Sequence, residues 1–169
     1  MAFSMKKIAM IAAACLALAA NGGTIDRAAA MIKRSEGFRP SVYRCEAGRK
    51  TIGYGFTSAA LVSKGTMTEA EASAELNKIC GEIVKGLRAD LGTSLKESEE
   101  AAIVSFIYNV GWGNYKASSL RRLLKEGRRG AIVGIEFRRW VYVRKGKSKV
   151  VCRGLAIRRA REARCFMCG

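Results

Sequence analysis

A carboxyl group, a thiol and a hydroxyl follow one another in residues 36–55, as Glu36, Cys45 and Thr51. A carboxylic acid that keeps its proton near neutral pH can serve as a general acid. A thiol has an ordinary pKa of about 8.5, so Cys45 is mostly neutral unless Arg44 or Arg49 lowers that pKa. As a thiolate it could accept a proton from water or stabilise positive charge. This stretch therefore predicts a catalytic cleft with Glu36 as the acid.

The segment before Glu36 has the apolar spacing of a helix, at Ile25, Ala28, Ala29 and Ile32. Thr24 is a candidate N-cap and Gly37 a candidate left-handed stop. Glu36 would then lie at the negative end of the helix dipole, where a partly desolvated carboxyl tends to keep its proton. The alternative is a solvated glutamate at a helix end, since most glutamates lie on the surface.

Beyond Gly37 the pattern changes to two short strands, predicted at 41–43 and 51–55, around a turn at 46–49. Gly53 and Gly55 would leave one face of the second strand bare. A bare backbone beside a candidate acid suggests the close approach of a ligand, so Gly53 is a candidate substrate-binding residue. A glycine bulge in a small hairpin is the alternative.

The rest of the chain is predicted to be mostly helical. A long helix is expected from Thr68 to about Leu91, because Thr68 and Glu71 form a capping-box pattern ahead of an apolar stripe. Further helices are predicted at 97–109, 119–124, 131–140 and 155–165. The basic run 144–149 is expected to be a flexible, solvated turn. The two tryptophans, Trp112 and Trp140, are expected to pack in the core.

The chain is strongly basic and contains no histidine. Its formal net charge is +17, and 16 basic against 3 acidic residues fall between Arg121 and Arg164. Such a surface favours a polyanionic partner, whether cell wall, anionic lipid or nucleic acid. The lack of histidine excludes Ser-His-Asp and Cys-His nucleophile systems and histidine-ligated zinc. A carboxylate-based enzyme survives this test.

The N-terminus has the form of an export signal. Lys6 and Lys7 precede an apolar run, residues 8–20, in which Ala17-Leu18-Ala19 offers a cleavage site. The run is shorter than the ~20 residues that a stable membrane span needs. Two outcomes stay open: a cleaved signal peptide and an uncleaved N-terminal anchor. Both predict export.

The order of Glu36, Cys45 and Thr51, followed by an Ile-Gly-x-Gly sequence at 52–55, resembles the phage-type lysozymes of glycoside hydrolase family 24. The resemblance runs from about Ile25 to the C-terminus and returns in residues 106–115, 118–124, 136–140 and 153–165. It implies an α+β, mostly helical, lysozyme-like fold in two lobes. It also implies an endolysin that hydrolyses the β-1,4 bond between N-acetylmuramic acid and N-acetylglucosamine in peptidoglycan and lyses the host cell.

The resemblance implies roles for the three residues of the first stretch. Glu36 is the acid, Cys45 stands at the usual Asp position, and Thr51 helps to place the water. Because aspartate is usual there, the cysteine leaves it open whether this residue acts as base, nucleophile or electrostatic stabiliser. The resemblance favours inversion, which needs roughly 6.5–9.5 Å between the two groups.

Further site residues are implied in the helical part of the chain. Asn109 is expected to face the cleft and bind a sugar, and simple capping of its helix is the alternative. Of the adjacent pair Arg158 and Arg159, we expect Arg159 to reach the acid as its salt-bridge partner and to belong to the substrate-binding set. A surface arginine in a very basic helix is the alternative.

The implied organisation is a signal segment, residues 1–23, followed by a lysozyme domain, residues 24–169. That domain divides into a small β-hairpin lobe with the cleft (24–67), a connecting helix (68–91) and a helical C-terminal lobe (92–169). Some endolysins that resemble this chain keep a signal-arrest-release segment, which tethers the enzyme to the bacterial inner membrane before it is released. The resemblance therefore favours the releasable anchor over the cleaved signal peptide and implies export to the periplasm. We expect a monomer that acts on peptidoglycan without a cofactor or metal and does not bind nucleic acid.

The chain has six cysteines: Cys15, Cys45, Cys80, Cys152, Cys165 and Cys168. An even number in an exported protein implies disulfides, although the pairing cannot be deduced. We hypothesise that Cys45 is held in a disulfide while the enzyme is tethered, and that Cys15 takes part in its release by thiol exchange. The alternative is that neither thiol is oxidised.

Three other functions remain compatible with parts of the sequence. A cationic protein that disrupts membranes without catalysis would use the charge and the apolar N-terminus. A nucleic-acid binder would use the basic C-terminal part. A lytic transglycosylase also uses a single glutamate, and its anhydro-sugar products would distinguish it from a hydrolase.

Overall fold

The structure is a computed structural model that describes residues 23–45, 48–146 and 148–168. It is mostly helical and contains two separate two-stranded antiparallel sheets, as the resemblance implied. The elements in chain order are α2 (Thr24–Glu36), β1 (Arg39–Arg44), β2 (Lys50–Gly53), α3 (Ala59–Val62), α4 (Glu69–Leu91), α5 (Glu97–Lys116), α6 (Ser119–Lys125), α7 (Ala131–Phe137), β3 (Tyr142–Lys145), β4 (Ser148–Val151) and α8 (Arg153–Met167).

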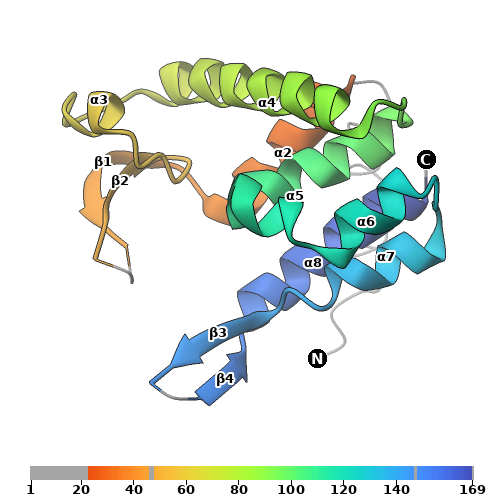
Figure 1. The fold of residues 1–169 in the computed structure, drawn as a ribbon. Coiled ribbons are helices and arrows are strands. Elements are labelled where there is room, and N and C mark those ends of the chain that lie inside the picture. The colour runs from red at the N-terminus through yellow and green to blue at the C-terminus, as the bar shows by residue number, and fades with distance from the viewer. Residues whose placement is uncertain (1–22, 46–47, 147, 169) are drawn as a thin grey trace, which may run out of the picture.

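Helix α5 lies at the centre of the helical body, where it packs against α8, α2 and α4 (Figure 1). Every residue from Ala101 to Ile107 is buried, so neighbours can cover this helix on several sides. Phe106 meets Phe137 and Trp140 edge to face, with ring centroids 5.5 and 5.4 Å apart. Trp112 also packs against the core, which confirms the prediction for both tryptophans.

Helix α4 runs along one side of this body (Figure 1). The predicted capping box is present, because the Thr68 hydroxyl accepts from the Glu71 N–H while the Glu71 carboxylate accepts from the Thr68 N–H. Gly92 ends the helix in the left-handed conformation. The predicted helix is thus confirmed at both ends. Its buried face is apolar: Ala72, Leu76, Cys80, Ile83, Val84, Leu87 and Leu91.

The two sheets are hairpins. In the first, β1 pairs with β2 with Tyr43 opposite Thr51. Strand β2 ends at Gly53, earlier than predicted, because Gly53 has φ 64° and the chain turns back so that Ile52 and Phe56 exchange backbone hydrogen bonds. The second hairpin, β3–β4, was expected to be a solvated turn within the basic run 144–149. That prediction was wrong, because flanking valines and Tyr142 extend the pairing beyond the charged residues.

Two helix boundaries also differ from expectation. Gly23 is the N-cap of α2, and the hydroxyl of Thr24 instead donates to the buried Glu100 carboxylate at 2.8 Å. The Glu100 carboxylate is buried and needs hydrogen-bond donors, so the Thr24 hydroxyl bonds to it and does not cap the helix. Helix α5 extends past Asn109 to Lys116, but with a kink at Gly111, where φ is 80°.

No disulfide joins two of the cysteines that the structure describes, which are Cys45, Cys80, Cys152, Cys165 and Cys168. Cys15 lies outside the described residues, as does the whole predicted export segment. None of the helices in the described part of the chain combines the length and apolar character that crossing a membrane requires.

Candidate active site

Glu36 is the last residue of α2, and its position depends on glycines that follow it. Gly37 has φ 69° and caps the helix by donating its N–H to the Lys33 carbonyl. A Cβ on Gly55, where φ is 91°, would lie 3.3 Å from Oε2 of Glu36. The Glu36 side chain is 26% exposed. The acid is therefore half-buried and lies directly against the backbone beyond β2.

Arg158 on α8 is the ion-pair partner of Glu36, with 2.5 Å between Nη1 and Oε1. Its guanidinium also donates to the Ser105 carbonyl at 3.1 Å and to Glu162 at 3.2 Å. The expectation that Arg159 would reach the acid is therefore corrected. Consecutive residues of a helix point about 100° apart, so only one of the two arginines can face α2.

Arg159 points instead into the core, where it is fully buried. It stacks on the Phe106 ring at 4.8 Å and donates to the Glu162 carboxylate and to Oδ1 of Asn109. Asn109 itself is exposed on α5. A buried guanidinium cannot contact a sugar directly, so any effect of Arg159 on substrate binding must act through Asn109.

Glu162 connects these two arginines and was not predicted from the sequence. It is fully buried, and it accepts hydrogen bonds from Ser105 at 2.7 Å and from both arginines. Burial raises the pKa of Glu162 and lowers that of Arg159, while their mutual attraction opposes both shifts. The signal in the sequence was the helical spacing of Glu162, three and four residues after the arginines.

Tyr108 is a second residue near the acid that was not predicted from the sequence. Its hydroxyl donates to the Tyr54 carbonyl at 2.7 Å. Burial and the negative charge of Glu36 both raise the pKa of Tyr108, so the phenol remains a neutral donor. This bond ties α5 to the chain between Gly53 and Gly55, next to Glu36.

Cys45 and Thr51 both belong to the β1–β2 hairpin. The Cys45 N–H donates to the Arg49 carbonyl at 3.0 Å, and the Cys45 carbonyl accepts from the Gly48 N–H at 2.7 Å. Thr51 is 4% exposed, and its hydroxyl donates to the same Arg49 carbonyl at 3.1 Å. The Arg49 carbonyl therefore accepts hydrogen bonds from both the Cys45 backbone and the Thr51 side chain.

Gly53 is buried, and its missing side chain is explained by packing. A Cβ there would lie 2.7 Å from the Phe56 ring and 3.2 Å from the Met67 sulfur. The face that was predicted to be bare is covered by these side chains. The glycine bulge that was the alternative interpretation is not observed at Gly53 either, because Gly53 pairs with Arg39 and begins the turn between Ile52 and Phe56. This turn and the packing account for the glycine without a ligand.

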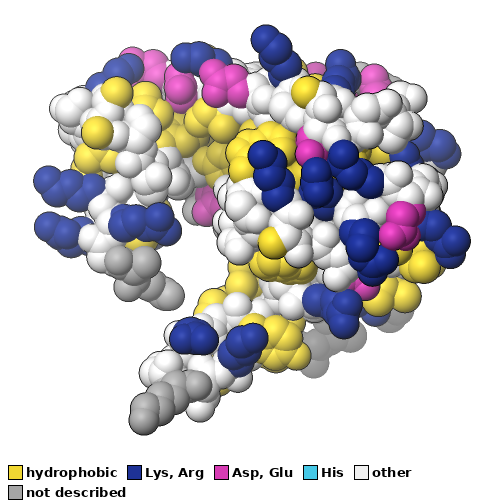
Figure 2. Space-filling model, in the orientation of Figure 1, with side chains coloured by type: hydrophobic (Ala, Val, Ile, Leu, Met, Phe, Trp, Pro, Cys, Tyr) yellow, Lys and Arg dark blue, Asp and Glu magenta, His cyan; other side chains and the backbone are white. Residues whose placement is uncertain are grey.

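The surface is hollowed between the β1–β2 hairpin and the helical body (Figure 2). The helical wall of the hollow is contributed by α5 and α8, and the other wall by β1 and β2 (Figure 1). Glu36 joins these walls, because it ends α2 and is paired with α8. The arrangement can deliver a proton to a ligand in the hollow, and Arg158 can stabilise the carboxylate left behind.

The sequence matches a family model described as phage lysozyme over residues 33–162. It is 36% identical to an endolysin of Bacillus phage PZA over 82% of this chain and 53% of the relative. It is 34% identical to a SAR-endolysin of Bacteriophage PS119 over 73% of this chain and 77% of the relative. The chain thus spans about half the length of the Bacillus phage relative.

Solved structures with the same fold agree. The muramidase domain of SpmX from Asticaccaulis excentricus matches with a TM-score of 0.74 and 29% identity, over 82% of this chain and 93% of that one. An endolysin from Escherichia coli O157:H7 phage FAHEc1 matches with a TM-score of 0.71 over 82% of this chain and 89% of that one. At 24% identity, this second likeness concerns the fold alone.

Proposed function

Because this chain belongs to the phage lysozyme family, we propose that it is a lytic muramidase. Its substrate is peptidoglycan, and the bond it hydrolyses is the β-1,4 bond between N-acetylmuramic acid and N-acetylglucosamine. The observation that carries this proposal is the position of Glu36, half-buried at the end of α2, against the backbone of Gly55 and paired with Arg158.

In this mechanism Glu36 protonates the glycosidic oxygen while positive charge builds on the sugar as an oxocarbenium-like ion. The leaving group then departs, and Arg158 stabilises the negative charge that appears on Glu36. Cys45 and Thr51 organise the opposite face, where water attacks the anomeric carbon and inverts it. The proton that this water loses passes to the Cys45 thiolate or to solvent, while the leaving group keeps the proton from Glu36. Their shared anchor on the Arg49 carbonyl supports a joint role in placing that water.

Asn109 is proposed to bind the sugar from the helical wall. Its exposure and its bond from Arg159 support this role, because a held amide keeps its NH₂ group directed outward as a donor. Arg159 is a positioning residue for Asn109. Gly53 supports the hairpin next to the acid and is not proposed to touch the substrate.

The decisive variant is Glu36→Gln, which removes the proton donor and keeps the shape. General acid catalysis contributes about 10²–10⁴-fold, so we expect a loss of at least that size. Mass spectrometry of the muropeptides released from purified walls, with and without reductant, measures it. Full activity of the variant would remove the acid assignment. Anhydro-sugar ends would replace the hydrolase by a transglycosylase, and killing by the variant would favour membrane disruption.

The role of the thiol is tested separately. Cys45→Asp restores the side chain that is usual in the family and should be active, whereas Cys45→Ser should be nearly inactive because a hydroxyl does not ionise near neutral pH. The same muropeptide assay gives both rates. A wild-type rate for the serine variant would show that sulfur is dispensable.

We further propose that residues 1–20 direct export to the periplasm and tether the enzyme to the inner membrane before release. The SAR-endolysin relatives support this, together with the two lysines ahead of the apolar run. Tethered protein should sediment with membranes and keep its full mass. Cleavage after Ala19 would contradict the tether. A tethered form whose activity is unchanged by reductant and by Cys15→Ser would contradict the thiol switch.

A further inference from the structure

Both hairpins carry two positive charges directly opposite each other. In β1–β2 Arg44 is the partner of Lys50, and in β3–β4 Arg144 is the partner of Lys149. Like charges in directly opposed positions destabilise a sheet. Throughout the described ranges, none of these four side chains forms a salt bridge that would balance them. The same unfavourable feature in two separate hairpins points to a function for the charge.

The two hairpins lie on the same side of the molecule. They project from the helical body and leave a space between them (Figure 1). Lys and Arg side chains are visible on both sides of the hollow that separates the hairpins (Figure 2). A ligand that occupies the hollow would therefore have positive charge on either side of it.

The β3–β4 hairpin also shows which kind of partner fits. Its two apolar pairs, Tyr142 opposite Val151 and Val143 opposite Val150, lie at the base, whereas Arg144 and Lys149 lie toward the turn. A hairpin that inserts into a membrane needs apolar residues at its tip, so this order disfavours insertion into lipid. It favours an anion that the tips meet in water. No acidic residue occurs between Phe137 and Arg161, so nothing in this segment would repel such an anion.

We propose that Arg44, Lys50, Arg144 and Lys149 form a cationic collar that binds the carboxylates of the peptide stems on the glycan strand. This inference rests on the proposed muramidase function. The stems branch from N-acetylmuramic acid, so a strand in the hollow brings their carboxylates to its rim. Exposed charge pairs are individually weak, and a collar acts through their number. It would raise affinity and association rate and take no part in bond cleavage.

The test removes the charge from each side in turn. Walls are used either untreated or after amidation of their carboxylates with carbodiimide and ammonia. The proteins are wild type, Arg144→Gln/Lys149→Gln and Arg44→Gln/Lys50→Gln. Release of reducing ends gives the half-saturating wall concentration and the maximal rate, and sedimentation with walls gives binding of the same hairpin variants in the Glu36→Gln background.

On untreated walls each hairpin variant should need about fivefold more wall for half-saturation, because two exposed pairs are lost. The unchanged maximal rate is expected of Arg144→Gln/Lys149→Gln, whose hairpin carries none of the proposed catalytic residues. On amidated walls wild type and variants should coincide. The effect should also disappear at ~1 M salt, where the Debye length is about 3 Å. Equal losses on amidated and untreated walls would overturn the assignment to carboxylates.

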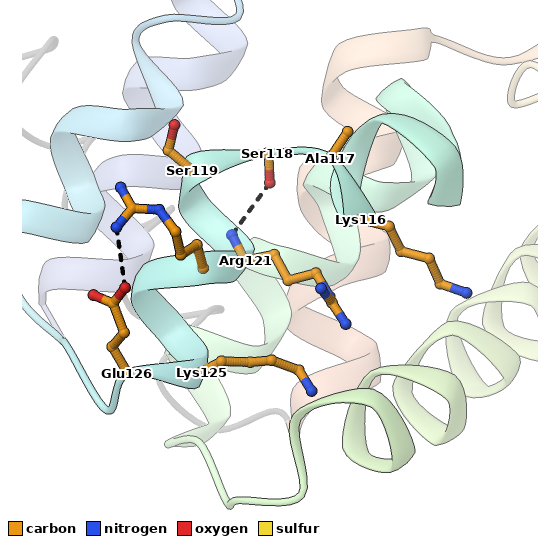
Figure 3. A pocket seen from close by; sticks show the side chains of 8 residues that line it. Lys116, Ala117, Ser118, Ser119, Arg121, Lys125 and Glu126 are labelled. Carbon is orange, nitrogen blue, oxygen red and sulfur yellow. Dashed lines mark hydrogen bonds and ion pairs between the residues drawn. The ribbon is translucent and has the colours of Figure 1, made fainter.

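The control is Lys125→Gln/Arg128→Gln. It also removes one lysine and one arginine, but both lie outside the two hairpins. Lys125 belongs to a separate basic patch around α6, where Lys116, Arg121 and Lys125 point the same way (Figure 3). A fivefold loss in this control as well would mean that net charge alone is responsible and would overturn the collar.

Stability and catalysis are separated from the collar by two further readouts. Removal of two positive charges that face each other across a hairpin should leave the thermal midpoint unchanged or raise it. The two hairpins provide two independent variants for this measurement. If wild type releases no reducing ends but sedimentation still depends on the collar and on wall carboxylates, the muramidase proposal fails while the collar stands. If reducing ends are released but sedimentation depends neither on the hairpin charges nor on the wall carboxylates, the collar is wrong and the muramidase proposal stands.

Discussion

At the scale of single residues, the acid depends on a guanidinium that cannot move freely. Arg158 is 6% exposed on its side chain and is bonded to Glu36, to the Ser105 carbonyl and to Glu162. A group anchored at several points fixes the direction of the carboxylate it pairs with. Glu162 therefore matters to the acid although it lies too deep to touch a substrate.

Glu162→Gln should lower both stability and turnover. Two buried arginines would lose the charge between them, and breaking a buried ion pair costs about 3–5 kcal/mol. Denaturant unfolding measures this change. We expect kcat to fall, because Glu36 loses its orientation, and KM to rise, because Arg159 loses the partner that holds it against Asn109.

Glu100→Gln is the matched control for this prediction. Glu100 is also a buried glutamate with an arginine partner, Arg88, but it lies near Thr24 at the opposite end of α2 from Glu36. It should lower stability and leave kcat of the folded enzyme unchanged. An equal fall in kcat for both variants would assign the Glu162 effect to general destabilisation.

At the scale of elements, the end of β2 is a turn built on two glycines with different neighbours. Gly53 has φ 64° and faces Phe56 and Met67, whereas Gly55 has φ 91° and faces Glu36. Both backbones are unfavourable for a residue with a Cβ. The turn therefore supports the core at one position and the acid at the other.

Alanine at these two positions should separate the two effects. Both variants should lose about 1–3 kcal/mol of unfolding free energy from backbone strain. Gly53→Ala should lose more, because its Cβ would lie 2.7 Å from the Phe56 ring. Gly55→Ala should show the larger loss of kcat, because the new methyl group displaces Glu36. The opposite ranking in kcat would contradict the placement of the acid at Gly55.

At the scale of the whole molecule, carboxylates anchor the helices to one another in a chain of high positive charge. Asp90 on α4 accepts two bonds from Arg121 on α6, both at 2.8 Å, and these bonds lower the pKa of Asp90. Burial alone would raise the pKa of Glu100, but its bonds from Arg88 and Thr24 lower it. Both carboxyl groups are thus charged more readily in the folded state than in the unfolded one.

Stability should therefore fall in acid. A carboxyl whose pKa is lower in the folded state contributes stability above its unfolded pKa, about 4, and loses that contribution as the pH falls through the folded pKa. Thermal midpoints from about pH 7 to about pH 2 measure the loss for wild type and for Asp90→Asn. The difference between the two proteins should be large at neutral pH and shrink below about pH 4. A difference that does not change with pH would show that the charge of Asp90 is not involved.

Much of the fold could be predicted from local patterns. The capping box at Thr68, the apolar face of α4 and the glycine after Glu36 are short-range signals, and each produced the element it indicated. The hairpin β3–β4 was missed because its charged turn dominates the composition, while its pairing depends on residues on either side. The cap at Thr24 was misassigned because its partner, Glu100, is distant in the chain.

The sequence by itself determined the candidate acid, the family and the chemistry that a chain without histidine can perform, because residue types and their spacing are local properties. Only the tertiary structure decided that Arg158 and not Arg159 meets Glu36, that Glu162 lies between them, and that Phe56 covers Gly53. It also decided that two hairpins, each with two positive charges that face each other, lie on either side of one hollow. These are relations between segments distant in sequence, and they depend on how the helices rotate and pack against one another.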